Sequence, residues 1–197
     1  MSFNNARLIL LLFVIAVALP AQDAAVDTSS FRIIAEGGAG YSYRISSAKL
    51  SLGDELRSGP AVSFRIKWGS GRVVSVGLET GWISISSLET MRGTPDFGPV
   101  HIASSLTAVP VIGFISLQRS GIEASAGLGY YRVSSVSTVM GVSMESSEWD
   151  LSYLVSIGYA LPLNTDWNII GTVRWNNIAE QKISVASFQA QIQYRLY

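Results

Sequence analysis

The sequence contains no cysteine, a single histidine and few charged residues. Without cysteine there is no disulfide framework, no thiol nucleophile and no cysteine-ligated metal. Charged residues make up 14% of the 197 positions, whereas an ordinary soluble domain carries about 25%. Lys and Arg together number 14, as do Asp and Glu, so no basic excess indicates a nucleic-acid partner. The mean hydropathy is nevertheless positive, at +0.33, and this excess of apolar residues needs a structural explanation.

Long apolar runs are also missing from the body of the chain, which excludes a bundle of membrane-spanning helices. The one apolar stretch is Leu8–Leu19, which follows a weakly basic start and precedes small residues. It is too short to span a bilayer comfortably and is typical of a secretory signal peptide. We predict a signal peptide over residues 1–22, cleaved between residues 18 and 25, and a short tail over 23–30. The alternative is a buried hydrophobic helix.

Beyond residue 30 the chain alternates between apolar and polar residues with a period of two, which predicts two-faced β-strands. Between residues 31 and 45, for example, odd positions are apolar or aromatic and even positions are mostly polar, charged or glycine. The strands predicted in this way cover residues 31–45, 62–68, 74–82, 102–117, 122–130, 149–161, 167–175 and 188–196. Residues 102–117 are apolar in both phases around Pro110, which leaves their register open.

The connections between these segments alternate in length. Residues 69–71, 119–121 and 164–166 carry the Gly, Asn and Asp residues of tight hairpin turns. Longer loops are predicted over residues 46–58, 87–100, 134–148 and 177–184. Short turns at one rim and longer loops at the other are typical of outer-membrane β-barrels.

The apolar face of these strands is too bulky to point inward. A soluble sandwich also has alternating strands, but here nearly every strand carries about five large apolar side chains on one face. An eight-stranded barrel only just accommodates the side chains of its interior. We therefore predict an all-β fold in which residues 31–197 form an eight-stranded antiparallel transmembrane β-barrel with its apolar face in lipid.

Aromatic residues support the membrane interpretation because they gather at two levels, near predicted strand ends. Such girdles mark the two interfaces of a membrane barrel. The predicted girdle residues are Trp68, Trp82, Trp149, Trp167, Trp175 and Tyr194.

Three segments resemble the eight-stranded outer-membrane barrels, the family around the transmembrane domain of outer-membrane protein A and the small outer membrane protein beta-barrel domains. They are Leu106–Ile112, Glu123–Tyr130 and the terminal strand Gln189–Tyr197. The resemblance implies insertion by the barrel-assembly machinery. We also expect export to the outer membrane, contact with outer-membrane lipids, and a monomer without cofactor or nucleic acid. The terminal aromatic residue, Tyr197, departs from the family pattern because it is one residue out of phase with the apolar row ending at Leu196.

Charged residues in the inward phase form the main candidate site. They are Arg32, Glu36, Arg44, Arg65, Lys67, Glu79, Glu123, Arg174 and Arg195. Because charges in so narrow an interior need partners or water, we favour a salt-bridged plug of the lumen. The alternative is an ion pathway that the excess of Arg and Lys would make anion-selective.

Catalytic chemistry finds little support in the sequence. Some outer-membrane barrels are lipid A deacylases with a His-x-Ser pair, but the residue two positions after His101 is Ala103. Ser105 shares its face yet lies about 13 Å away along a strand, too far for a nucleophile–base hydrogen bond. We predict no catalytic residue, metal or cofactor, and expect His101 at the base of a loop. A serine from a neighbouring strand keeps a lipid-modifying enzyme as the less favoured alternative.

The functional hypothesis is a non-enzymatic outer-membrane barrel that anchors surface loops for adhesion or ligand contact. The Ser-rich segment Ser134–Ser147 is expected to be either a mobile extracellular loop or an adhesion tip. The competing hypotheses are a narrow pore for ions or small solutes and a lipid A-modifying enzyme.

Overall fold

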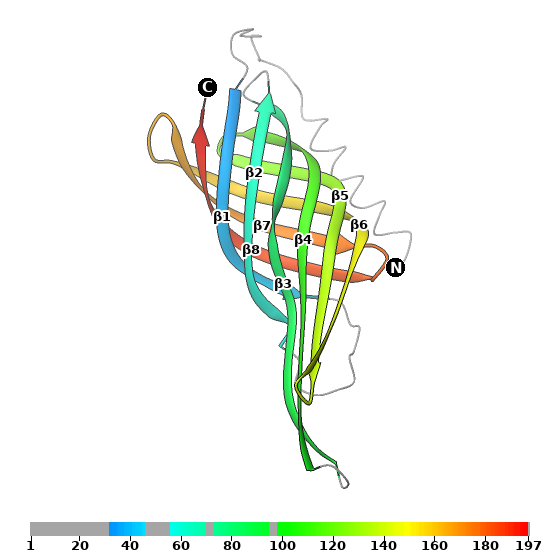
Figure 1. Cartoon of the computed structure of the whole chain (residues 1–197). Coiled ribbons are helices and arrows are strands. Elements are labelled where there is room, and N and C mark those ends of the chain that lie inside the picture. Colours follow the sequence, from blue (N-terminus) through cyan, green and yellow to red (C-terminus); the bar gives the residue numbers. More distant parts are fainter. Residues whose placement is uncertain (1–31, 46–55, 70–72, 95–97, 197) are drawn as a thin grey trace.

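Eight antiparallel strands form a closed barrel in chain order, as the computed structural model shows for residues 32–45, 56–69, 73–94 and 98–196 (Figure 1). Their bounds are β1 (Arg32–Arg44), β2 (Ser58–Gly69), β3 (Val74–Thr94), β4 (Gly98–Arg119), β5 (Ile122–Val139), β6 (Val142–Pro162), β7 (Trp167–Ile178) and β8 (Ile183–Arg195). These residues contain no helix long and apolar enough to cross a membrane. The predicted fold class is confirmed.

The register of the strands sets the tilt of the barrel. The stagger can be followed by starting at Ile33 and moving each time to the paired residue on the next strand. This path passes through Ile33, Trp68, Val76, Ile115, Ala126, Val155, Trp175, Ala186 and Tyr43. The path starts on β1 at residue 33 and returns to β1 at residue 43, a stagger of ten residues. A stagger of this kind requires strands tilted by about 35–45° from the barrel axis. The sheet has no open edge within the wall, so its backbone polar groups are paired where no water could satisfy them.

Side chains alternate across the wall: outward positions are mostly apolar, whereas inward positions carry most of the buried polar groups together with some apolar ones. On β2, Phe64 is 48% exposed and the next residue, Arg65, is 1% exposed. The register of β4 is also resolved: Val111 and Ile115 face outward and Ile112 faces inward with no exposed surface. This arrangement is the inverse of a soluble protein and presents an apolar belt to the surroundings.

The two ends of the barrel differ. At one end, called here the turn end, short turns join β4 to β5 and β6 to β7. Ser120 and Gly121 adopt φ of 50° and 83°, the two positive values of a tight hairpin turn. In the second turn, the Asn164 side-chain oxygen accepts hydrogen bonds from the backbone N–H groups of Asp166 and Trp167. The opposite end is called the hairpin end.

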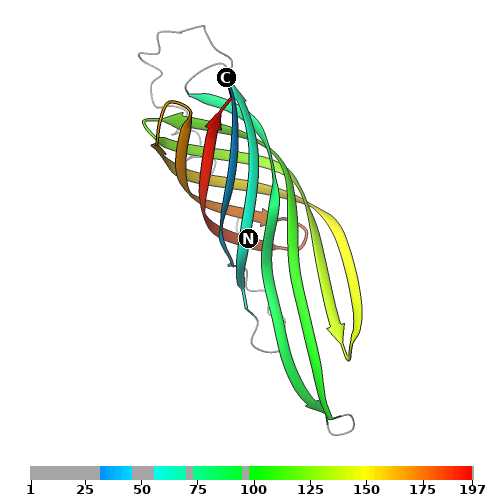
Figure 2. The ribbon, with the colours of Figure 1, turned by 60° about the vertical axis from the view of Figure 1, so that its left-hand side comes forward.

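Two of the predicted loops at the hairpin end are wrong, because most of residues 87–100 and all but the turn of 134–148 are strand. β3–β6 are 18–22 residues long, whereas β1, β2, β7 and β8 have 12 or 13. Only the two-residue turn Met140-Gly141, with φ of 52° and 80°, joins β5 to β6. The extra length projects beyond the barrel as two hairpins, with β3–β4 the longer (Figures 1 and 2). Threonine and valine favour strands, and serine is tolerated in them. These segments can therefore form strands, but they lack the alternation of apolar and polar residues on which the prediction depends.

The longer strands also change the place of two tryptophans. Trp82 and Trp149 lie within β3 and β6 and not at strand ends, because both strands continue past the barrel wall. At the turn end, Trp167 packs on Tyr194 with ring centroids 4.4 Å apart. Trp175 makes an edge contact with Tyr153 at 5.4 Å, nearer the hairpin end. The remaining girdle residue, Trp68, lies just before the end of the described part of β2.

Several predictions lie outside the described residues. They are the signal peptide over 1–22, the tail over 23–30, the turn residues 70–71, most of the 46–58 connection and the terminal Tyr197.

Candidate functional site

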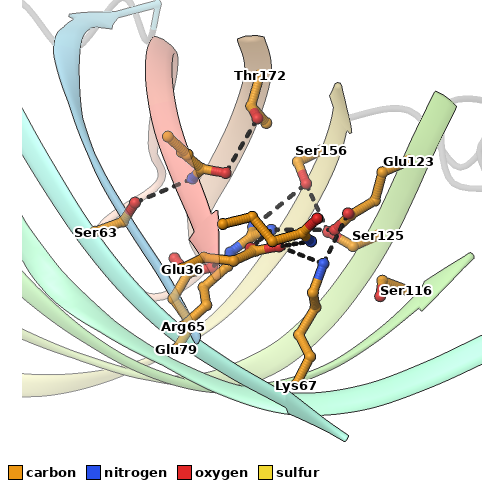
Figure 3. Close-up of polar contacts among 12 residues, drawn as sticks. Glu36, Ser63, Arg65, Lys67, Glu79, Ser116, Glu123, Ser125, Ser156 and Thr172 are labelled. Carbon is orange, nitrogen blue, oxygen red and sulfur yellow. Dashed lines mark hydrogen bonds and ion pairs between the residues drawn. The ribbon is translucent and has the colours of Figure 1, made fainter. Parts of the chain in front are cut away.

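Six of the nine predicted inward charges meet in the half of the lumen nearer the turn end (Figure 3). They project from five different strands, and each is at most 5% exposed. The members are Glu36 on β1, Arg65 and Lys67 on β2, Glu79 on β3, Glu123 on β5 and Arg174 on β7. Three carboxylates therefore face three cations, and this group is called the lumen cluster.

Glu79 joins two cations of the lumen cluster. Its Oε2 accepts a hydrogen bond from Arg65 Nε at 2.5 Å. Its Oε1 accepts a second from Arg174 Nη2. Because β3 and β7 lie on different sides of the barrel, the Arg174 bond crosses the lumen. Arg65 also stacks over the Phe114 ring, 4.9 Å from its centroid, which gives the planar guanidinium a cation–π contact.

Lys67 joins the other two carboxylates. Its Nζ donates to Glu123 Oε2 at 2.7 Å and forms an ion pair with Glu36 Oε1. Arg65 Nη1 lies 3.9 Å from one oxygen of each of these glutamates. The six groups thus form one connected, charge-balanced network, which supplies the partners that a buried charge needs.

Amides and hydroxyls extend the network, and the sequence analysis missed them. Gln193 Nε2 donates to Glu36 Oε1 at 2.7 Å, and Arg174 Nη1 donates to Gln189 Oε1 at 2.9 Å. Ser63 also donates to Gln189 Oε1, at 2.6 Å. The glutamines are in the inward phase of β8, as their alternation with outward Phe188, Ala190 and Ile192 in the sequence indicates. That alternation is present in the sequence and is the signal that predicts inward glutamines on this strand.

The other three predicted charges lie away from the lumen cluster. Arg32 and Arg195 are half-buried at the turn end, where they line a mouth of about 400 Å³ together with Lys67. Arg195 Nη1 donates to the Thr165 backbone oxygen at 3.1 Å. Arg44 is buried at the last residue of β1, near the hairpin end. The excess of cations among the nine predicted inward charges is therefore distributed over the two ends of the barrel and not along a continuous path.

An apolar layer fills the lumen between the lumen cluster and the hairpin end. Its fully buried members include Ile83, Ile85, Ala108, Ile112, Tyr131, Val133, Leu154, Ile178, Ile183 and Val185. Ile178 and Ile183 flank the β7–β8 turn, which places this part of the layer at the opening of the hairpin end. The inward phase was expected to carry glycine, serine and charge, so this layer corrects that expectation. It packs side chains where a water-filled channel would need space.

The filled lumen predicts a conductance close to zero. Protein reconstituted into planar bilayers should give no stable, salt-dependent current steps, because the apolar layer and the charge-balanced network close the path in series. A porin reconstituted in parallel provides the positive control. Reproducible current steps that grow with potassium chloride concentration and shrink after Arg65→Ala would contradict this prediction.

His101 lies within β4, opposite Met91 of β3, so its predicted place at the base of a loop is wrong. Its Nε2 is 3.0 Å from Glu89 Oε1, and both side chains are exposed. The contact recorded for this ring is with a carboxylate and not with a serine hydroxyl. Across the described parts of the chain, no group of three His, Asp or Glu side chains is placed to hold a metal ion.

Two carboxylates lie close together near the hairpin end of the lumen. Asp150 of β6 is 2% exposed and lies beside Glu180 of the β7–β8 turn. Since neither group belongs to the lumen cluster, this pair is a local feature of the outer rim.

The chain resembles known proteins in its fold but not in its sequence. No family model matches the sequence, and no curated protein resembles it in sequence. A major outer membrane protein from Thermus thermophilus has a TM-score of 0.59 at 12% identity, over 85% of this chain and all of that one. Ail, the attachment invasion locus protein of Yersinia pestis, has a TM-score of 0.56 at 11% identity, over 84% of this chain and 98% of Ail. This chain has the fold of the small outer-membrane β-barrels.

The outer-membrane barrel fold agrees with the surface of the molecule. Leu78, Leu128, Ile157 and Phe188 are each more than half exposed on the outside of the wall, a surface that is stable in lipid and costly in water. Together, the fold and the apolar belt place this barrel in an outer membrane.

Proposed function

We propose that this barrel is a non-enzymatic membrane anchor that holds a rigid sheet outside the membrane for contact with a protein partner. The observation that carries the proposal is the continuation of β3–β6 beyond the wall. Short turns of such barrels face the periplasm, and the longer connections face the outside. The two hairpins therefore extend into the external medium.

The outer part of β6 supports this role because it is an open sheet edge. β7 pairs with β6 only from Ser152 onward, so residues 142–149 pair with β5 alone in the described structure. All eight of these residues are exposed, including Val142 at 62% and Met144 at 72%. An edge with free N–H and C=O groups can pair with a strand of another protein, and the exposed apolar side chains add affinity.

The interior supports a passive barrel. Six of its charges pair with one another in the lumen cluster, and its opening at the hairpin end is filled by the apolar layer. Ail, which its name describes as an attachment protein, has the same fold. A barrel of this size is therefore compatible with a contact function. Because one fold serves many functions, the argument depends on the extended sheet and not on the likeness.

Truncating the β5–β6 hairpin tests the proposal. Residues 134–147 are replaced by Asn-Gly, which joins the paired residues Val133 and Glu148 through a favourable two-residue turn. Cells that display the truncated barrel should adhere to immobilised extracellular-matrix proteins and cultured cells no better than cells with an empty vector. Cells with the full-length protein should adhere at least several-fold more.

The matched control is Met140→Asn, which keeps the hairpin length and places a residue suited to positive φ in the turn. It should adhere like the wild type. Heat-modifiable electrophoretic mobility must show equal amounts of folded barrel in all strains. Adhesion that is the same with and without the hairpin would refute the proposed role.

A further inference from the structure

A groove of about 530 Å³ runs along the outer wall across β3–β6, within the size range of small-ligand sites. Its floor contains Gly113 of β4 and Ala126 of β5, which lie on neighbouring, outward-facing positions. Larger side chains border it, among them Ile115, Leu128 and Val155. The groove exists because Gly113 and Ala126 place little or no side chain between these larger neighbours.

Gly113 is not required by the backbone. A Cβ added at this position would approach only the Leu128 carbonyl oxygen, at 3.9 Å, which is an ordinary contact. Several inward glycines differ, because a Cβ at Gly77, Gly81 or Gly129 would come within 2.4 Å of a backbone oxygen. The absence of a side chain at Gly113 therefore creates space on the lipid side without serving the packing of the barrel.

With the hairpin end outside, as proposed above, the groove lies on the lipid-facing wall and leads toward the outer surface of the membrane. Trp68 borders it toward the turn end, and Tyr153 borders it toward the hairpin end. Beyond Leu128 in the same outward row of β5 come Tyr130 and then Arg132, both exposed. Arg132 lies about 13 Å along the strand from Leu128, at four residues of strand rise. An apolar groove thus leads to a cation at the level where lipid head groups begin.

We propose that this groove binds one acyl chain of an anionic, phosphate-bearing lipid of the outer leaflet, with Arg132 contacting the phosphate. The apolar lining matches a hydrocarbon chain, and a lipid is the molecule that surrounds this face of the barrel. A cation at the head-group level attracts an anionic lipid, and a guanidinium can donate two parallel hydrogen bonds to a phosphate. Chain and head group are then held by one continuous strip of β5.

Native mass spectrometry of the refolded barrel with added dipalmitoylphosphatidylglycerol tests the groove. The wild type should retain one lipid, and Gly113→Leu should lower its affinity about tenfold, or ~1.4 kcal/mol, by filling the floor. The matched control is Gly171→Leu on the lipid-facing side of β7, where an added Cβ has no atom within 4 Å. It should retain the lipid like the wild type, because it adds the same side chain outside the groove.

Arg132→Gln tests the head-group contact. It should lower the affinity for phosphatidylglycerol about fivefold, or ~1 kcal/mol, and leave that for zwitterionic phosphatidylcholine with the same chains unchanged. Equal lipid retention by Gly113→Leu and Gly171→Leu would overturn the proposal, as would retention of no lipid by the wild type. A wild-type dimer that only Gly113→Leu dissociates would also overturn it, since the groove would then be an interface between two copies.

Discussion

Glu79→Ala should destabilise the folded barrel by about 3–5 kcal/mol, the usual cost of breaking a buried ion pair. Glu79 accepts hydrogen bonds from both Arg65 and Arg174, so its removal leaves two like charges close together in a lumen that is closed to bulk water. The free energy of unfolding can be measured by urea titration in phospholipid vesicles, with tryptophan fluorescence as the signal.

Glu89→Ala is the matched control, because Glu89 is on the same strand but has a side chain 78% exposed. Its effect should stay within about 0.5 kcal/mol, as for other surface substitutions. Glu79→Gln should lie between the two, since the amide oxygen still accepts hydrogen bonds while its NH₂ group cannot. If Glu79→Ala and Glu89→Ala unfold at the same urea concentration, the lumen cluster does not stabilise the barrel.

Gly40→Ala should prevent normal closure of the barrel between β1 and β8. The added Cβ would lie 1.9 Å from the Phe188 carbonyl oxygen and 2.6 Å from Gln189 Cα. Both are backbone atoms, so the two strands must separate where their ladder closes the wall. Overpacking commonly costs about 1–3 kcal/mol and occasionally more, and we expect the upper part of this range or beyond because no side chain can move aside.

The measurement is the fraction of protein with heat-modifiable mobility after refolding into detergent. Gly37→Ala provides the control on the same strand, because a Cβ at Gly37 meets nothing within 4 Å on the lipid side. It should refold like the wild type. Normal yield and stability of Gly40→Ala would show that β1 and β8 are further apart than the structure has them.

The wall of this barrel could be predicted from the sequence because each strand carries its own evidence. The alternation of Phe64, Arg65 and Ile66 indicates which side faces lipid without knowledge of any neighbour. The contacts inside could not be predicted in the same way. That Arg174 meets Glu79, 95 positions earlier in the chain, depends on how far the strands are staggered, and alternation does not report stagger.

The outer part of the molecule escaped prediction for a different reason. In residues 134–147 serine occurs on both faces of the strand, because both faces meet water once the sheet leaves the membrane. The alternation of apolar and polar residues arises because one face of a strand meets lipid and the other meets the lumen. It therefore stops where the strands leave the membrane. The inward Ile83 and Ile85 continue the odd-numbered phase of Glu79, but they lie beyond residue 82, where the predicted strand ends.

The extended strands are all consecutive, so they rise from one side of the barrel only. This gives the molecule a front, formed by β3–β6, and a back, formed by β7, β8, β1 and β2 (Figure 2). A neighbouring protein in a crowded membrane can approach the back closely, whereas at the front it meets the overhanging sheet. The rotation of the barrel about the membrane normal therefore determines which neighbouring proteins can contact its back.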